Sequence, residues 1–142
     1  MSDYKRFMDR SCGRWVSHRR YLFGRKLTSG EYVTEFNIEL KDGNIYSVDW
    51  SGQTEGTMDL VLDGDELKRS RTYFDADDDS THQKMATIDD DAVVFRTSYD
   101  GTSYREEIRF LGDDIRLRQN VGTDVETGDV VMVGQYYETR VV

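Results

Sequence analysis

The stretch Gly13-Arg14-Trp15-Val16-Ser17-His18-Arg19-Arg20-Tyr21-Leu22-Phe23 decides the fold. In an extended chain successive side chains point to opposite faces, so every second residue shares a face. One face of this stretch is large, aromatic and partly polar, because it collects Trp15, Ser17, Arg19, Tyr21 and Phe23. A period of two, rather than the 3.6 of a helix, predicts a β-strand.

The same period returns along the rest of the chain. Further strands are predicted in Tyr32–Leu40, Tyr46–Trp50, Met58–Leu62, Leu67–Phe74, Val93–Tyr99, Tyr104–Phe110, Ile115–Asn120 and Val130–Val142. Turn signals such as Asp63-Gly64 and Asp100-Gly101 separate several of them. Helical spacing occurs in the first dozen residues, where Phe7 and Met8 share a face. Roughly eight to ten short strands with no later crossover helix predict an antiparallel meander.

This meander is expected to form one domain over residues 1–142, since that length suits a single core. Closing into a cylinder protects the edge strands of a meander best. The predicted fold class is therefore all-β, a lipocalin-like antiparallel up-and-down β-barrel with a short N-terminal α-helix. Such a barrel can hold a small ligand inside. A two-sheet sandwich is the alternative.

The charge of the chain disfavours several partners. Asp and Glu number 28 against 19 Lys and Arg, which gives a net charge of -9. This field opposes phosphate backbones and anionic lipids, so neither nucleic acid nor membrane is expected as a partner. The sequence has no apolar run near the roughly 20 residues of a membrane span, and its start lacks a secretory core. Cys12, the single cysteine, cannot form an internal disulfide, so a cytoplasmic location is expected.

The sequence lacks the residues that metal-binding and nucleotide-binding motifs require at fixed spacings. The acidic run Asp75-Ala76-Asp77-Asp78-Asp79 lacks the glycine and the glutamate that a calcium loop needs at fixed positions, and is interpreted as a solvated loop. His18, His82 and Cys12 fall short of the usual ligand count of zinc without carboxylates. The chain has no glycine-rich phosphate loop and no nucleophile elbow. Neither a metal nor a nucleotide cofactor is expected.

Several charged side chains lie on strands whose alternation would turn some of them toward the core. They are Arg19, Glu106, Arg116, Arg118, Glu138 and Arg140. For any one of them solvent exposure is the commoner outcome, because charged residues are rarely buried without a partner. As a set, with large aromatic neighbours, they predict a pocket for a flat, conjugated ligand with acidic groups. Guanidinium forks bind carboxylates, and aromatic faces cover rings.

The residues that carry these features also resemble a known family in order along the chain. The opening stretch Gly13–Arg19 is similar to the G-x-W-x-S-x-R signature of the S-type phycobiliprotein lyases, the CpcS/CpeS family. The likeness continues through Val48-Asp49-Trp50, Glu55-Gly56-Thr57, the spacing of Leu67, Arg69 and Tyr73, Thr97-Ser98-Tyr99, Glu106–Phe110, Ile115-Arg116-Leu117-Arg118 and Glu138-Thr139-Arg140. This ordered series covers nearly the whole chain.

The resemblance implies a bilin chromophore lyase. Such a protein binds a linear tetrapyrrole, phycoerythrobilin or phycocyanobilin, and promotes its thioether attachment to a cysteine of a phycobiliprotein subunit, which supplies the nucleophile. It also implies a homodimer and a source among cyanobacteria, algae or cyanophages, hence a cytosol or a plastid. A bilin or other hydrophobic-ligand carrier of lipocalin type, without transfer, is the alternative.

The resemblance further implies roles for individual side chains. Glu106, Arg116 and Arg118 are assigned to the reaction itself, with the arginines on the propionates and the glutamate on the pyrrole N–H groups. The other expected bilin-binding residues are Trp15, Ser17, Arg19, Trp50, Arg69, Tyr99, Glu138 and Arg140. Cys12 is not expected to be catalytic, because nothing near it in the sequence lowers its pKa.

Overall fold

The structure, a computed structural model, describes residues 3–24, 28–70 and 82–141, and the side chains within these ranges except those of residues 28, 29 and 70. One helix precedes ten strands. The elements are α1 (Asp3–Arg10), β1 (Gly13–Phe23), β2 (Thr28–Asp42), β3 (Ile45–Ser51), β4 (Gly56–Asp63), β5 (Glu66–Ser70), β6 (His82–Asp89), β7 (Ala92–Tyr99), β8 (Thr102–Leu111), β9 (Ile115–Asp124) and β10 (Val130–Arg140).

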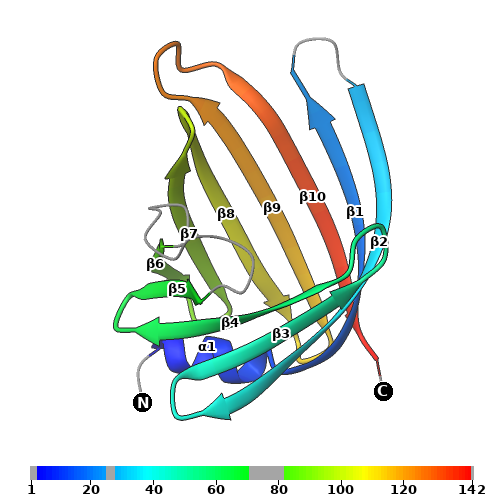
Figure 1. The fold of residues 1–142 in the computed structure, drawn as a ribbon, viewed down its shortest axis with the longest axis vertical. Helices are drawn as coiled ribbons and strands as arrows, with labels where there is room; N and C mark the ends of the chain where they lie inside the picture. The colour runs from blue at the N-terminus through cyan, green and yellow to red at the C-terminus, as the bar shows by residue number, and fades with distance from the viewer. Residues whose placement is uncertain (1–2, 25–27, 71–81, 142) are drawn as a thin grey trace.

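The strands form one closed antiparallel barrel. Each strand pairs with its neighbours in the chain, and β1 pairs with β10 to complete the circle, with Trp15 opposite Arg140 (Figure 1). The predicted up-and-down barrel with an N-terminal helix is confirmed, and the sandwich alternative is wrong. The strand predicted over Leu67–Phe74 is described as far as Ser70, and the acidic run of residues 75–79 lies outside the described residues.

Helix α1 lies across one end of the barrel, which is called the closed end here (Figure 1). Its apolar face points inward, where the Phe7 ring meets Phe110 edge-on at 5.3 Å and Phe95 at 6.1 Å between centroids. The helix ends at Arg10, and the hydroxyl and amide of Ser11, the next residue, both donate to the Phe7 carbonyl. The described part of the chain contains no helix long and apolar enough to cross a membrane.

A polar cluster fastens α1 to the barrel. Lys5 Nζ donates to Asp9 Oδ1 at 2.8 Å and to the Tyr46 hydroxyl at 2.7 Å, and that hydroxyl donates to Asp9 Oδ1 at 2.6 Å. Burial, followed by the bond to Asp9, raises the pKa of Tyr46 to about 12. Because each partner satisfies the others, Tyr46 on β3 can be buried completely while its hydroxyl remains bonded to the helix.

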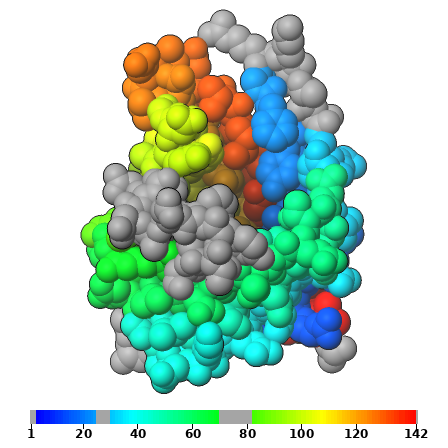
Figure 2. All heavy atoms as spheres, viewed as in Figure 1, coloured from blue at the N-terminus to red at the C-terminus, as the bar shows by residue number. Residues whose placement is uncertain are grey.

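The strands differ in length, and this leaves one side of the barrel taller than the other. β1, β2, β8, β9 and β10 have 10 to 15 residues, whereas β3 to β6 have 5 to 8. Figure 2 shows the blue atoms of β1 and the orange atoms of β9 and β10 projecting beyond the green atoms of β4 and β5. The inner face of the long strands therefore continues past the short ones, toward the end opposite α1, called the open end here.

Candidate functional site

The interior of the barrel contains a cavity of about 600 Å³. Helix α1 contributes Phe7, Met8 and Ser11 to its floor. Apolar residues of β2 to β5 and β8 line most of its wall: Phe36, Ile38, Val48, Met58, Leu60, Leu67 and Ile108. Arg116, Arg118 and Glu106 add charge on the opposite wall, and the 51% exposure of Tyr99 shows that the cavity is open to solvent.

A chain of ion pairs, called the ionic layer here, crosses the inner face of β8, β9 and β10. It consists of Glu106, Arg116, Arg118 and Glu138. Glu138 is shared, with Oε1 3.2 Å from Arg116 Nε and Oε2 3.3 Å from Arg118 Nη1. Arg118 Nη2 also donates to Glu106 Oε1 at 3.0 Å. Strand register produces this arrangement, because Glu138 lies directly opposite Arg116 and one row from Arg118.

The ionic layer is deeply buried. Glu138 is 0% and Arg116 3% exposed. Burial would raise the pKa of Glu138, but Arg118 and Arg116, with a hydrogen bond from Ser17, hold it below the ordinary glutamate value. Burial lowers the pKa of Arg116 to about 10, whereas Glu106 and Glu138 outweigh burial and raise that of Arg118. All three groups are therefore charged at neutral pH.

The hydrogen-bonding capacity of the ionic layer is only partly used. The Nε atoms of Arg116 and Arg118 and Oε1 of Glu138 have no hydrogen-bond partner in the described part of the chain. Arg116 Nε lies near Glu138 Oε1 without the angle that a hydrogen bond requires. Buried polar groups are normally bonded, so unmet donors beside a cavity indicate a place for a polar ligand group or water.

Aromatic rings hold the guanidinium groups in position. Arg116 lies over Trp15 at 5.3 Å and over Phe110 at 5.7 Å from the ring centroids. The Tyr136 ring is shared by Arg19 at 4.7 Å and Arg118 at 4.9 Å, and the three residues are adjacent in register. Cation–π contacts of this kind fix a long side chain without neutralising its charge.

Seven of the sequence-predicted site residues line the cavity. They are Arg19, Trp50, Arg69, Tyr99, Glu106, Arg116 and Arg118. Glu138, Trp15 and Ser17 lie behind this surface and are fully buried. Ser17 connects the lining residue Arg19 with the buried Glu138, because its hydroxyl accepts from Arg19 Nε at 3.0 Å and also bonds Glu138.

The structure places Arg140 away from the cavity, which differs from the prediction that it binds the ligand. Its guanidinium donates to the carbonyls of Arg10, Cys12 and Asp113 at 2.6 to 3.1 Å, and its ring partner is Trp15 at 4.3 Å. The absent side chain of Gly13 leaves room for it. Arg140 thus bonds the carbonyls that end α1, because strand closure brings it to the level of the helix.

Sequence reasoning missed the polar lining residues Ser11, Thr34, Thr54 and Gln83, and it also missed Asn120, which lies outside the lining. The Oδ1 atom of Asn120 is buried without a partner in the described residues, and Asn120 lies directly opposite Glu106. The alternation of Arg116 and Arg118 carries the signal for it, since residue 120 falls on the same face. Cys12 is half-buried at the end of α1, and burial, then Asp9, raises the pKa of its thiol. Such a thiol is a poor nucleophile at neutral pH.

Comparisons with known proteins agree with this architecture. The family model described as CpeS-like protein matches residues 59–141, more than half of the chain. A Picosynechococcus protein that carries the name chromophore lyase CpcV is 47% identical over 45 residues, which cover 32% of this chain and 21% of that protein. A Nostoc protein that carries the name phycocyanobilin lyase CpcS 2 is 38% identical over 50 residues, 35% of this chain and 27% of that protein. Both matches span well under two thirds of the relatives' own length.

The fold also has a solved counterpart. The structure of the S-type phycobiliprotein lyase CpeS from Guillardia theta superposes with a TM-score of 0.79 at 20% identity, and the match covers 100% of this chain and 94% of that chain. At this level of identity the likeness shows the shared barrel alone.

Proposed function

Because the chain belongs to the CpeS-like family, we propose that it is a phycobiliprotein chromophore lyase that binds a linear tetrapyrrole inside its barrel. The observation that carries this proposal is the ionic layer, in which two arginines with unused donors face a largely apolar cavity. A tetrapyrrole of the bilin type combines conjugated apolar rings with two propionates. The cavity offers the complementary pair of properties, since guanidinium groups bind carboxylates and the apolar wall covers rings.

The two arginines take different parts in this binding. Arg116 is almost fully buried against aromatic rings, so it supplies a fixed positive charge. Arg118 is 17% exposed and lines the cavity, so it can turn one edge of its guanidinium to a propionate while Glu138 holds the other. Arg19 adds a third guanidinium at the same level.

Glu106 changes partner when the ligand enters. In the free protein it accepts from Arg118. A propionate that takes this place leaves Glu106 free to accept hydrogen bonds from pyrrole N–H groups, as a carboxylate in a site of low dielectric does strongly. Asn120 lies opposite Glu106 and offers a second acceptor, Oδ1, to the same edge of the ligand.

The reaction itself needs no nucleophile from this chain. A cysteine of the phycobiliprotein subunit adds across an exocyclic double bond of the bilin: sulfur bonds to carbon, the carbon–carbon π bond breaks, and the thiol proton ends on the chromophore. No oxidant or leaving group is involved. The lyase contributes by holding the chromophore in one conformation and excluding water, which lowers the entropic part of the barrier.

Titration of the purified protein with phycoerythrobilin and with phycocyanobilin tests binding, followed by absorption and fluorescence. Addition of an apo-phycobiliprotein subunit and a denaturing gel then test covalent transfer against a lyase-free control. Arg118→Ala is expected to weaken binding about 10–100-fold, because charge-assisted hydrogen bonds contribute about 1.5–3 kcal/mol. The dissociation constant of Arg118→Lys, which keeps the charge but loses the two-pronged guanidinium, should lie between those of the wild type and Arg118→Ala.

The outcomes separate the two candidate activities. Assisted transfer to the subunit supports a lyase. Binding with no gain over the lyase-free control would indicate a bilin carrier, and unchanged binding in Arg118→Ala would contradict the assigned site.

A further inference from the structure

The inner face of the long strands carries a second group of side chains beyond the ionic layer. Tyr21 and Phe23 follow Arg19 on β1, and Met132 and Tyr104 lie on the same face of β10 and β8. These four residues are called the aromatic wall here. At a rise of about 3.3 Å per residue, Tyr21 and Phe23 lie about 7 and 13 Å beyond Arg19, toward the open end.

Two rings of the wall, those of Tyr21 and Phe23, contact each other and stand apart from the buried core. Tyr21 and Phe23 are stacked, with centroids 5.8 Å apart and planes inclined by 17°. Tyr21 also meets Tyr136 edge-on at 5.5 Å, and Tyr136 in turn contacts Arg19 and Arg118. Neither Tyr21 nor Phe23 belongs to the hydrophobic core among the described residues. The wall is thus continuous with the ionic layer through the Tyr136 ring.

Glycines keep the wall recessed. A Cβ at Gly134, which pairs with Tyr21, would lie 3.2 Å from the Tyr21 ring, and a Cβ at Gly122 would lie 3.1 Å from the Tyr104 ring. Both distances are tighter than ordinary contacts. Neither glycine has a positive φ, so the backbone itself does not require glycine there. Their small size instead lets the two tyrosine rings lie close against the neighbouring strands.

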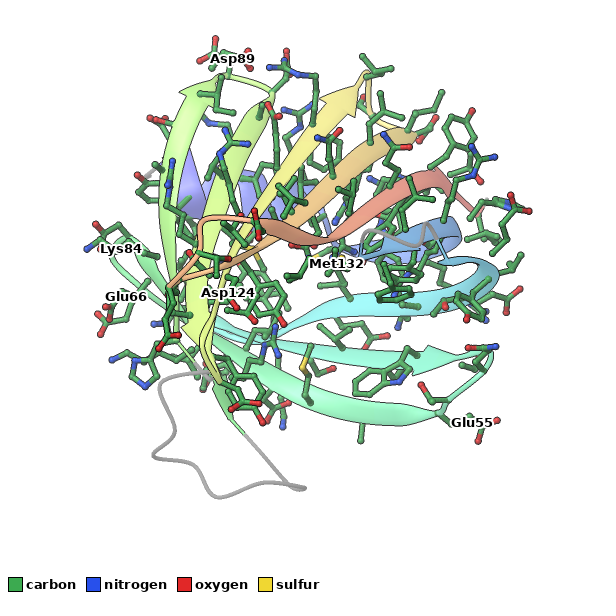
Figure 3. The ribbon with its side chains drawn as sticks, turned by 90° about the horizontal axis from the view of Figure 1, so that it is seen from above. Glu55, Glu66, Lys84, Asp89, Asp124 and Met132 are labelled. Carbon is green, nitrogen blue, oxygen red and sulfur yellow. The ribbon has the colours of Figure 1, made fainter. Side chains whose placement is uncertain are left out.

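The wall is accessible. Phe23 is 46% exposed and Tyr21 is half-buried. Figure 3, viewed from above, shows Met132 toward the middle of the ring of strands, whereas Glu66 and Lys84 lie at the outer edge. Such a surface is typical of a binding site, because its aromatic rings and methionine remain open to solvent. Covering them during folding would stabilise the protein more than leaving them exposed.

The chemistry of the ligand in the proposed function indicates what this surface takes. In a linear tetrapyrrole the two propionates belong to the two central rings, so an outer ring projects from each side of a carboxylate anchor. One outer ring can enter the cavity toward α1, which is lined by apolar residues. In an extended chromophore the other outer ring projects in the opposite direction, where Tyr21, Phe23, Tyr104 and Met132 lie.

We propose that the aromatic wall is a second subsite of the lyase, which holds the outer ring of the tetrapyrrole that faces the open end. This inference rests on the proposed function and extends it. Since α1 covers the other end, the ring on the wall is the one that the thiol of an acceptor protein can reach. The wall therefore selects which end of the chromophore is presented for attachment.

Three variants test the subsite by absorption titration with phycocyanobilin. Phe23→Ala removes a half-exposed ring, and Gly122→Val fills the recess by displacing Tyr104. Leu22→Ala is the matched control, because it truncates an apolar side chain on the opposite face of the same strand. Thermal unfolding and circular dichroism verify that each variant is folded. We expect a dissociation constant raised about tenfold in the first two variants, the effect of losing one aromatic contact, and an unchanged one in Leu22→Ala.

The results distinguish the subsite from the function on which it rests. Wild-type affinity in both Phe23→Ala and Gly122→Val, with binding lost in Arg118→Ala, would overturn the subsite and leave the lyase proposal intact. Equal weakening in Leu22→Ala would also overturn it, because the effect would then be one of stability. If the wild-type protein binds no bilin, both proposals fail.

Discussion

Replacing Glu138 by Gln tests the ionic layer most directly. The substitution keeps the shape of the side chain and removes the negative charge that Arg116 and Arg118 share. Arg118 retains Glu106 as a partner, whereas Arg116 is left with aromatic rings and no carboxylate within ion-pair distance among the described residues. The change therefore leaves a guanidinium that is 3% exposed without a counter-charge.

The expected loss of stability follows from that burial. Removing one partner of a buried ion pair costs about 3–5 kcal/mol, because the desolvated charge that remains is uncompensated. The free energy of unfolding of a domain of this size is about 5–15 kcal/mol, so the variant should lose about a fifth or more of its stability. This corresponds to a melting temperature lower by about 10–15 °C. Glu35→Gln, on the exposed outer face of β2, should change stability by less than about 0.5 kcal/mol.

Urea unfolding of four proteins measures this effect: the wild type, Glu138→Gln, Glu35→Gln and the double variant Arg116→Met with Glu138→Leu. The double variant replaces the pair by apolar groups and should be much more stable than Glu138→Gln, since no buried charge is orphaned. A loss below about 1 kcal/mol in Glu138→Gln would refute the reasoning, because it would mean that water or another group already compensates Arg116.

The remaining predictions concern pH, the chromophore, the closed end and the thiol. Because the pKa of Glu138 is lowered in the folded protein, ionised Glu138 stabilises the fold above its ordinary pKa of 4.5, and this stabilisation is lost as the pH falls through the folded value. Acid should therefore reduce the difference in the free energy of unfolding between wild type and Glu138→Gln, measured by urea titration. Glu106→Gln should shift the absorption band of bound bilin; an unaltered spectrum would count against hydrogen bonding to the pyrroles. Tyr46→Phe should cost about 1–3 kcal/mol by losing two bonds to α1, and a neutral result would show that Lys5 and Asp9 pair equally well alone. Cys12 should react with Ellman's reagent at pH 7 more slowly than a free thiol, with the rate rising toward pH 9; fast reaction at pH 7 would contradict the raised pKa.

Alternation along single strands predicted the antiparallel barrel, although β6 was not among the predicted strands. It placed Glu106 on one face with Tyr104, Ile108 and Phe110. Arg116 and Arg118 were assigned to the pocket as part of a charged set and through the family resemblance, because the apolar residues of their strand lie on the other face. The same signal could have identified Asn120, which continues the face of the two arginines.

Height along the barrel axis could not be predicted in this way. Trp15 shares its face with Arg19, and Arg140 shares its face with Glu138, yet both lie one or two rows closer to α1 and outside the cavity. These rows follow from the register in which β1 meets β10, a pairing between distant parts of the chain that no local pattern encodes. The bonds of Lys5 and Asp9 to Tyr46 have the same origin, since they join a helix to a strand far along the sequence.

The pairing of β1 with β10, called the seam here, links ligand binding to the folding of the barrel. Pairing of the first strand with the last closes the longest loop in the chain, so the seam is expected to form late and slowly. Arg19 stands on one side of this seam and Glu138 on the other. A tetrapyrrole that contacts the residues held by both strands therefore binds the closed barrel and not the open one. Under the proposed function, chromophore at a hundredfold excess over its dissociation constant would stabilise closure by about 2.7 kcal/mol, so pigment supply would govern how much closed protein a cell maintains.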